Sequence, residues 1–249
     1  MVPWPGGAGD ATLGGMATGI DVPRRTRTSH FLAHRARAGA ERTTLRRWFT
    51  ATTVGELVGF LIPVAVVSAG ADELPGPLRF LLVVLAGAGE GAVLGWAQSR
   101  VLRPLLPGLS TRAWTARTAA AAALAWTIGM GPSTLGAVFD GWAPAVRVAV
   151  AVPAALLLLV SIGAAQWTVL RRVLPGSRWI AWTSAGWLAG LAVLLAVATP
   201  LWHPGQDVVL VAAIGALGGV GMAATMAAVT GWGLVRMLRA VPLRPAHPH

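Results

Sequence analysis

Residues 98–108 read QSRVLRPLLPG, and residues 166–176 read QWTVLRRVLPG, an offset of 68 residues without a gap. The match continues to Ala113-Trp114-Thr115 against Ala181-Trp182-Thr183, and 10 of the 19 positions from Gln98 to Ala116 are identical. Each copy follows a long apolar run, passes through an Arg-rich Pro-Gly turn and enters another apolar run behind a tryptophan. This pattern is typical of a connector between two membrane-spanning helices, and its repetition predicts an internal duplication.

Six long apolar runs of 20 to 28 residues follow one another along the chain. A helix needs about 20 apolar residues to cross the hydrocarbon core of a membrane, so all six are long enough. The composition agrees, since 55% of the residues are hydrophobic, 12% are charged and the mean hydropathy is +0.65. The sequence therefore predicts an all-α fold, a bundle of six transmembrane helices. The runs lie between Arg47 and Asp72, Arg79 and Arg100, Arg117 and Asp140, Arg147 and Arg171, Arg178 and His203, and Asp207 and Arg236.

The chain divides into three predicted segments. Residues 1–45 are rich in Gly, Pro, Ala and Arg without an apolar period, which predicts a disordered Arg-rich cytoplasmic tail. Residues 46–240 hold the six-helix transmembrane domain, and residues 241–249 form a short cytoplasmic tail. Met1 and Met16 both fit as the start of translation.

Arginine predicts the orientation. All 20 basic residues are Arg, and 18 of them lie in the two tails and in the two connectors that carry the repeat. Because cytoplasmic loops carry the excess of positive charge, both termini are expected in the cytoplasm of a bacterium, with the protein in its plasma (inner) membrane. The same rule explains the net charge of +11 without a nucleic-acid partner.

A third copy of the repeat is predicted from the chain ends. Residues 47–59 align with residues 178–190, and Leu234-Val235-Arg236 occupies the place of Val101-Leu102-Arg103. The second and third spans, the fourth and fifth, and the sixth and first would then be three versions of one unit that run in the same direction. This arrangement predicts a pseudo-threefold axis along the membrane normal, with the first span beside the sixth.

The cassette resembles one in uncharacterised bacterial polytopic membrane proteins that carry repeated Q-W-x-x-L-R-R segments. Residues 166–172 fit that pattern fully, while residues 98–104 have Ser99 in place of Trp and Pro104 in place of the second Arg. The resemblance implies a repeated membrane fold and no particular activity.

The repeated connectors carry the first candidate site residues, Gln98, Arg103, Gln166 and Arg171. The two glutamines lie just inside the cytoplasmic ends of their spans. They either form a polar cluster at the mouth of a pore or hydrogen-bond to the neighbouring connector. The second interpretation is preferred, because Gln accompanies the connector in both copies.

Glu56 and Glu90 are the ionisable side chains that lie deep in the apolar runs. An intramembrane carboxyl group is costly and marks either a functional site or a polar link between helices. Counted from Arg47 and Arg100, both lie at a similar depth, so the pair forms a candidate proton or cation site. If they meet, their mutual repulsion predicts that they hold one or two protons between them.

Two function hypotheses follow. The first is a non-catalytic integral membrane protein with a structural, accessory or partner-binding role, with the lipid bilayer and a membrane protein or second copy as partners. The alternative is a small transporter or a proton or cation pathway through Glu56 and Glu90. The chain has no Cys and no nucleophile–base or metal-ligand motif, so neither an enzyme nor a cofactor nor a metal site is expected.

Overall fold

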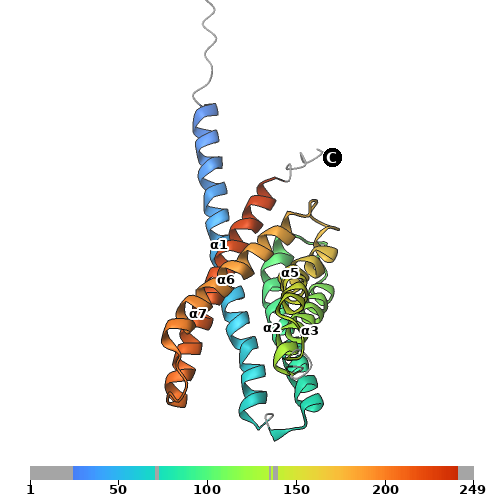
Figure 1. Cartoon of the computed structure of the whole chain (residues 1–249). Coiled ribbons are helices and arrows are strands. Elements are labelled where there is room, and N and C mark those ends of the chain that lie inside the picture. The colour runs from blue at the N-terminus through green and yellow to red at the C-terminus, as the bar shows by residue number, and fades with distance from the viewer. Residues whose placement is uncertain (1–24, 71–72, 135, 137–139, 241–249) are drawn as a thin grey trace, which may run out of the picture. The chain divides into compact units, whose positions relative to one another are not determined.

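The computed structural model describes residues 25–70, 73–134, 136 and 140–240, and these form six helices (Figure 1). The chain divides into two units, Met1–Gly39 and Ala40–His249, and only the start of the first helix is described in the first unit. The helices are α1 (Arg25–Ser68), α2 (Gly76–Leu105), α3 (Thr111–Thr134), α5 (Pro144–Leu170), α6 (Arg178–Leu201) and α7 (Val208–Arg239).

Helix α1 begins earlier than the sequence predicted. Residues 25–45, expected to be part of a disordered tail, are helical from Arg25 onward. Ala, Arg, Leu and Glu dominate residues 35–46, and all four favour helix. Extending a helix that the apolar span has already nucleated needs little further stabilisation. Residues 1–24 and 241–249, which complete the two predicted tails, lie outside the described residues.

Five of the six helices are long and apolar enough to cross a membrane, which indicates a multi-pass membrane protein. The sixth, α3, does not meet that criterion within its described residues. It contains Arg112 and Arg117 and is built largely from alanine and threonine, which lowers its mean hydropathy. Six spans were expected, so the structure supports five of them by length and composition.

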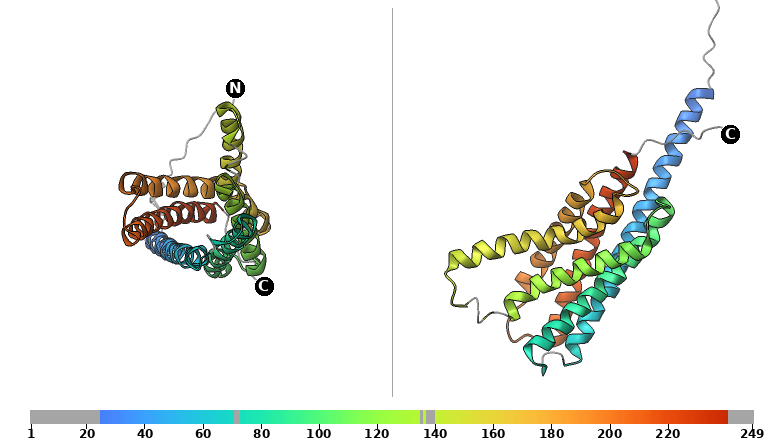
Figure 2. Two further views of the ribbon diagram at one scale, coloured as in Figure 1. Left: turned by 60° about the horizontal axis from the view of Figure 1, so that its bottom comes forward. Right: turned by 90° about the vertical axis from the view of Figure 1, so that its right-hand side faces the viewer.

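Within Ala40–His249 the helices pack in chain order and close on themselves. Helix α2 packs on α3, α3 on α5, α5 on α6 and α6 on α7. Helix α1 lies between α7 and α2, as the left view of Figure 2 shows. Trp48 of α1 hydrogen-bonds to Thr230 of α7, and Gly55 of α1 packs against Ala97 of α2. The first and last spans are therefore neighbours, as the sequence predicted.

Small residues make several of these helix contacts. A Cβ atom built on Gly91 of α2 would lie 2.4 Å from the Cβ of Ala122, and one on Gly190 of α6 would lie 2.9 Å from the carbonyl oxygen of Met222. Such glycines let helix backbones approach without a hydrophobic driving force. Gly215 and Gly219 of α7 have no neighbouring atom within 4 Å of a built Cβ in the described chain.

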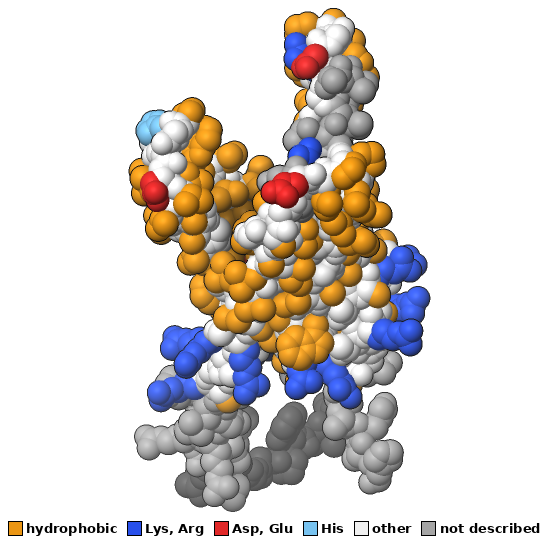
Figure 3. Space-filling model, turned by 90° about the horizontal axis from the view of Figure 1, so that it is seen from below, with side chains coloured by type: hydrophobic (Ala, Val, Ile, Leu, Met, Phe, Trp, Pro, Cys, Tyr) orange, Lys and Arg blue, Asp and Glu red, His pale blue; other side chains and the backbone are white. Residues whose placement is uncertain are grey.

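Most arginines lie at one end of the bundle and most exposed acidic side chains at the other (Figure 3). One end, called the Arg-rich end, holds the α2–α3 and α5–α6 connectors, Arg46 and Arg47 of α1, and the end of α7. At the other end, called the acidic end, lie Glu73, Asp140 and Asp207 in the helix connections. Near the Arg-rich end three arginines stack on tryptophans of the same helix, as expected at a membrane interface. These pairs are Arg100–Trp96, Arg171–Trp167 and Arg236–Trp232, at 5.7, 5.1 and 4.4 Å from the ring centroids.

Candidate functional site

Glu56 and Glu90 lie on the neighbouring helices α1 and α2, and both carboxyl groups are buried. Their exposed fractions are 2% and 7%. The helices approach closely at two glycines of α1. A Cβ atom on Gly55 would lie 2.7 Å from the Cβ of Ala97, and one on Gly59 would lie 2.9 Å from the carbonyl oxygen of Glu90. The structure thus buries both carboxyl groups at the α1–α2 interface.

Trp126 of α3 completes the surroundings of Glu90. Its Nε1 donates a hydrogen bond to Oε2 of Glu90 at 2.9 Å. The indole occupies the space left by Gly87 of α2, where a built Cβ atom would lie 2.0 Å from its Cδ1. Sequence reasoning did not include Trp126, although an indole N–H in an apolar helix needs an acceptor and so points to the nearest buried carboxyl.

Glu56 has no comparable partner. In the described part of the chain neither of its side-chain oxygens has a hydrogen-bond partner, and the buried hydroxyl of Thr52, one turn toward the Arg-rich end, has none either. Two ionised carboxylates in an apolar interior repel each other, and a hydrogen bond between two carboxyl groups requires a proton on one of them. This site can therefore hold a proton or a small cation, or it can link α1, α2 and α3 as a neutral pair.

A second buried polar group contains Gln98 and Gln166. The Nε2 of Gln166 donates to Oε1 of Gln98 at 2.9 Å and to Oγ1 of Thr118 at 3.1 Å. Each glutamine also accepts from a tryptophan of the following helix. Trp114 Nε1 donates to Gln98 Oε1 at 3.3 Å, and Trp179 Nε1 donates to Gln166 Oε1 at 3.0 Å.

A third tryptophan, from α1, joins this group. Trp48 Nε1 donates to Oγ1 of Thr230 on α7 at 3.0 Å. The ring of Trp179 lies 5.7 Å from that of Trp48 and 5.9 Å from that of Trp114, and all three tryptophans are 0–1% exposed. The resulting Gln-Trp cluster consists of Trp48, Gln98, Trp114, Thr118, Gln166, Trp179 and Thr230.

Gln98 and Gln166 do not line an opening, because they are 4% and 1% exposed. They hydrogen-bond to each other across the two copies of the repeat, and to Trp114, Thr118 and Trp179. The ungapped repeat placed Trp182 in the position of Trp114, whereas the tryptophan that donates to Gln166 is Trp179. Trp182 instead packs on Trp232, with the ring centroids 5.6 Å apart.

A spacing in the sequence could have identified the three cluster tryptophans. Each is followed four residues later by a buried threonine, so that both side chains lie on one face of a helix. The pairs are Trp48/Thr52, Trp114/Thr118 and Trp179/Thr183, and the threonines are 0–3% exposed. A tryptophan or a threonine alone is common in such helices, but a Trp-x-x-x-Thr spacing repeated in three helices is unusual.

Arg103 and Arg171, the other predicted connector residues, are exposed and take no part in the Gln-Trp cluster. Arg171 stacks on Trp167, as described above. Arg103 lines a cleft of about 590 Å³ beside the α2–α3 connector, together with Arg100, Pro104, Pro107 and Thr111. Within each copy of the repeated sequence, the glutamine is therefore buried and the arginine five residues later is exposed.

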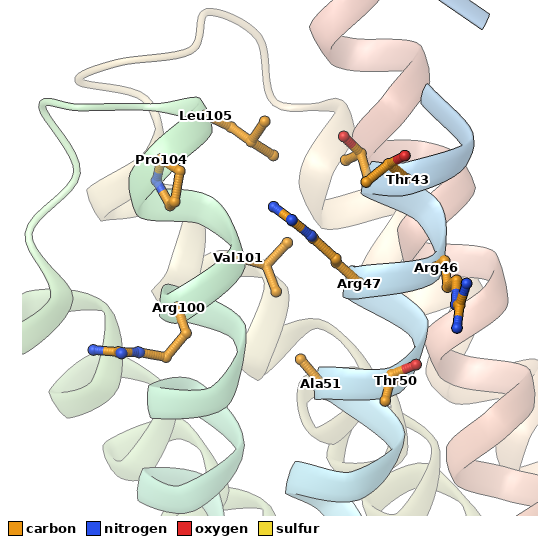
Figure 4. A pocket seen from close by; sticks show the side chains of 10 residues that line it. Thr43, Arg46, Arg47, Thr50, Ala51, Arg100, Val101, Pro104 and Leu105 are labelled. Carbon is orange, nitrogen blue, oxygen red and sulfur yellow. The ribbon is translucent and has the colours of Figure 1, made fainter. Parts of the chain in front are cut away.

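A larger cleft, of about 670 Å³, opens between α1 and α2 at the Arg-rich end (Figure 4). Arg47 extends from α1 toward Val101 of α2, while Arg46 and Arg100 point away on either side. Ala51 and Leu105 add an apolar wall, and Thr50 adds a hydroxyl group. The cleft thus combines cationic and apolar surface at one end of the bundle.

No group of three or more His, Asp or Glu side chains in the described ranges could hold a metal ion. The candidate sites are therefore the carboxyl pair with Trp126, the Gln-Trp cluster and the α1–α2 cleft. Comparison with models of known protein families, with curated proteins and with solved structures finds no match to this chain.

Proposed function

We propose that this chain is a multi-pass protein of a bacterial plasma membrane, with both termini and the Arg-rich end in the cytoplasm, and that it binds another transmembrane helix without catalysing a reaction. The observation that carries this proposal is a row of small residues on α7, near the acidic end, that packs against nothing in the described chain. The asymmetric distribution of arginine supports the orientation.

Helix α7 has two faces of different character. Gly218 and Gly221 face α6, where their built Cβ atoms would lie 2.7 Å from Leu194 and 2.9 Å from Val193. Gly215 and Gly219 lie on another face, one turn apart, and have open space around them. A small-xxx-small step of this kind is the usual contact surface between transmembrane helices. The unpacked step therefore fits a helix from another membrane protein or from a second copy of the chain.

The acidic-end half of α5 supports the same role. Val148, Val152 and Leu156 are 61%, 53% and 58% exposed, and residues 145–153 of this helix are all exposed. An apolar helix surface without helical neighbours is compatible with lipid alone. Its combination with the open small-residue face of α7 favours a bundle that accepts a further helix at this end.

The Gln-Trp cluster argues for binding over conduction. Its three tryptophans and two glutamines fill the interior at the Arg-rich end and are 0–4% exposed. Water or ions moving along the bundle would have to displace hydrogen bonds that satisfy buried polar groups, which is costly in an apolar interior. The cluster thus closes the bundle and keeps the helix pairs together.

A threefold internal repeat is part of this proposal. Gln98, Gln166 and Thr230 each accept a hydrogen bond from a tryptophan of the neighbouring helix. Four residues after each acceptor comes a fully buried leucine, at Leu102, Leu170 and Leu234. This register differs by one residue from the sequence alignment, which matched Leu234 with Val101. The helix pairs α2–α3, α5–α6 and α7–α1 would be the three units, and the likeness to proteins with Q-W-x-x-L-R-R cassettes agrees with such a scaffold.

The absence of Cys allows a clean test of partner binding. We expect a Gly219→Cys variant labelled with a benzophenone maleimide to crosslink, in native membranes, to a membrane protein or to a second copy of the chain. The matched control is Leu81→Cys on α2, which is 52% exposed and also lies near the acidic end, but has Pro77 and Leu85 at the four-residue spacing in place of small residues. Lipid adducts alone at position 219, or the same protein adducts at both positions, would show that the face of α7 is not a partner site.

The carboxyl pair favours a second candidate function, a proton or cation site used in transport. Its supporting observation is Glu56, which is 2% exposed and lacks a hydrogen-bond partner in the described chain. A helix link that served only stability would satisfy both carboxyl groups, as Trp126 does for Glu90. The Discussion describes the substitutions that separate the two candidates.

A further inference from the structure

We propose that the cleft between α1 and α2 at the Arg-rich end binds the phosphate headgroup of an anionic phospholipid. The inference requires only that the helices lie in a bilayer, so it stands whether or not α7 binds a partner. It rests on the charge of the cleft, on its apolar wall and on an exposed apolar stripe that leads away from it.

The charge of the cleft lacks a counter-ion among the residues that the structure describes. Arg46, Arg47 and Arg100 line it and make no ion pair with any described residue. Glu41 is the one acidic residue at the Arg-rich end of the described chain, and its carboxylate is bound by the guanidinium of Arg239 on α7. A phosphate group supplies the missing negative charge, and a guanidinium binds two of its oxygens at once.

The direction of Arg47 places such a phosphate between the two helices. Figure 4 shows the Arg47 side chain crossing the cleft toward α2, between Val101 and Leu105, with Ala51 one turn further along α1. A free inorganic anion would gain nothing from these apolar side chains. A phospholipid would bury its glycerol and upper acyl carbons against them while its phosphate meets Arg47.

An apolar stripe continues from the cleft along α1. Val54, Val58 and Leu61 are 52%, 49% and 62% exposed. Together with Arg47 and Ala51 they follow alternating steps of four and three residues, which places them on one side of a helix. Arg47 thus stands at the polar end of an exposed apolar track that runs toward the membrane interior, which is the order of headgroup and acyl chain in a lipid.

Other arginines at the same end provide a contrast. Arg172 and Arg178 of the α5–α6 connector are exposed and line none of the clefts described here. They contribute the same positive charge to the membrane surface without a groove. The loss of lipid binding on removal of Arg172 and Arg178 therefore measures non-specific attraction to positive charge. The loss on removal of two cleft arginines measures the contribution of the cleft itself.

The test is a titration of the full-length chain, purified in neutral detergent, with phosphatidylglycerol or phosphatidylcholine, followed by native mass spectrometry. We expect selective binding of phosphatidylglycerol, and in Arg47→Gln/Arg100→Gln a dissociation constant raised by about tenfold, because the variant loses the Arg47 headgroup contact and a second positive charge beside the cleft. Arg172→Gln/Arg178→Gln should change it by less than about threefold. A second variant, Ala51→Phe, fills the cleft without removing charge and should weaken binding to a similar degree as the first.

Three results would overturn the proposal. Equal losses in the cleft variant and in the Arg172→Gln/Arg178→Gln variant would mean that only surface charge attracts the lipid. Unchanged binding in Ala51→Phe, with the buried tryptophan fluorescence intact, would mean that the groove is not occupied. Full displacement of the lipid by millimolar inorganic phosphate would mean that the site binds a free anion instead of a lipid.

Discussion

The two ends of this bundle differ in the interactions that hold their helices together. At the Arg-rich end the interior is held by hydrogen bonds between Gln98, Gln166 and three tryptophans, all nearly inaccessible. Toward the acidic end the α5 side chains are exposed, and Gly215 and Gly219 of α7 meet no described neighbour. Lipid is as apolar as leucine, so apolar side chains alone give helices little reason to associate.

This difference suggests a division of roles between the ends. Hydrogen bonds between buried polar side chains are directional and fix which helices are neighbours. Small apolar surfaces are less specific and stay available to other helices. The Arg-rich end therefore determines the arrangement of the bundle, and the acidic end is free to bind. The carboxyl pair lies between them, buried like the first region and only partly hydrogen-bonded.

The largest effect is expected from Gln166→Leu, which keeps the volume of the side chain and removes its polar atoms. Three hydrogen bonds would be lost, and Trp179 Nε1 would be left without an acceptor in an apolar interior. We expect the free energy of unfolding in detergent to fall by about 2–4 kcal/mol. Titration with sodium dodecyl sulfate, followed by tryptophan fluorescence, measures it.

Gln206→Leu is the control for Gln166→Leu. Gln206 also hydrogen-bonds, to the backbone of Leu201 and His203, but in the exposed α6–α7 connection at the acidic end. Its loss should cost less than about 1 kcal/mol, because water replaces the lost partners. Equal costs for the two substitutions would contradict the idea that the Arg-rich end holds the fold together.

The next effect contrasts a packed glycine with an open one. Gly87→Ala places a methyl group 2.0 Å from the Trp126 ring, so the ring must move away from Glu90. We expect a loss of about 1–3 kcal/mol in the free energy of unfolding. Gly219→Ala meets open space and should change it by no more than about 0.5 kcal/mol.

The same detergent titration compares the two alanine variants. If Gly219→Ala were as destabilising as Gly87→Ala, the face of α7 near the acidic end would already be packed in solution. Such a result, together with an increase in the monomer fraction, would identify a second copy of the chain as the neighbour.

The sequence predicted the helical class, the adjacency of the first and last spans, and the two glutamines as paired residues of a repeat. It predicted Trp182 as the counterpart of Trp114, and this was wrong, because identical residues in two aligned segments do not show where each helix ends. Helix α2 continues to Leu105, seven residues past Gln98, whereas α5 ends at Leu170, four residues past Gln166. The two connectors therefore follow different paths, and Trp179, 13 residues past Gln166, takes the place beside its glutamine that Trp114, 16 residues past Gln98, takes beside Gln98.

Other features depend on contacts that no single segment encodes. Trp126 is adjacent to Glu90 because Gly87 leaves room for an indole from a different helix. The early start of α1 reflects propagation of a helix from its apolar span, which composition alone did not reveal. Counting residues predicted a similar depth for Glu56 and Glu90, but their burial at the α1–α2 interface depends on the close approach of the helices at Gly55 and Gly59.

A smaller loss of stability than for Gln166→Leu or Gly87→Ala is expected from Glu56→Gln/Glu90→Gln, which tests the region between the two ends. A glutamine oxygen can still accept from Trp126 Nε1, so we expect the free energy of unfolding to change by less than about 1 kcal/mol. Glu73→Gln, in the exposed α1–α2 connection, is the control. Glu90→Leu should cost more than the double variant, because it leaves the indole N–H without an acceptor.

The same variant separates the two candidate functions, because glutamine forms hydrogen bonds but neither binds nor releases a proton at neutral pH. If the pair serves transport, proteoliposomes with the natural chain should couple a sodium or potassium gradient to proton movement, and the double variant should not. If the pair only links helices, the double variant should remain folded and fully active in cells, and no coupled flux should appear in either sample. A double variant that unfolds while Glu73→Gln stays intact would contradict the expectation for stability, because Gln would then fail to replace Glu even as a hydrogen-bond acceptor.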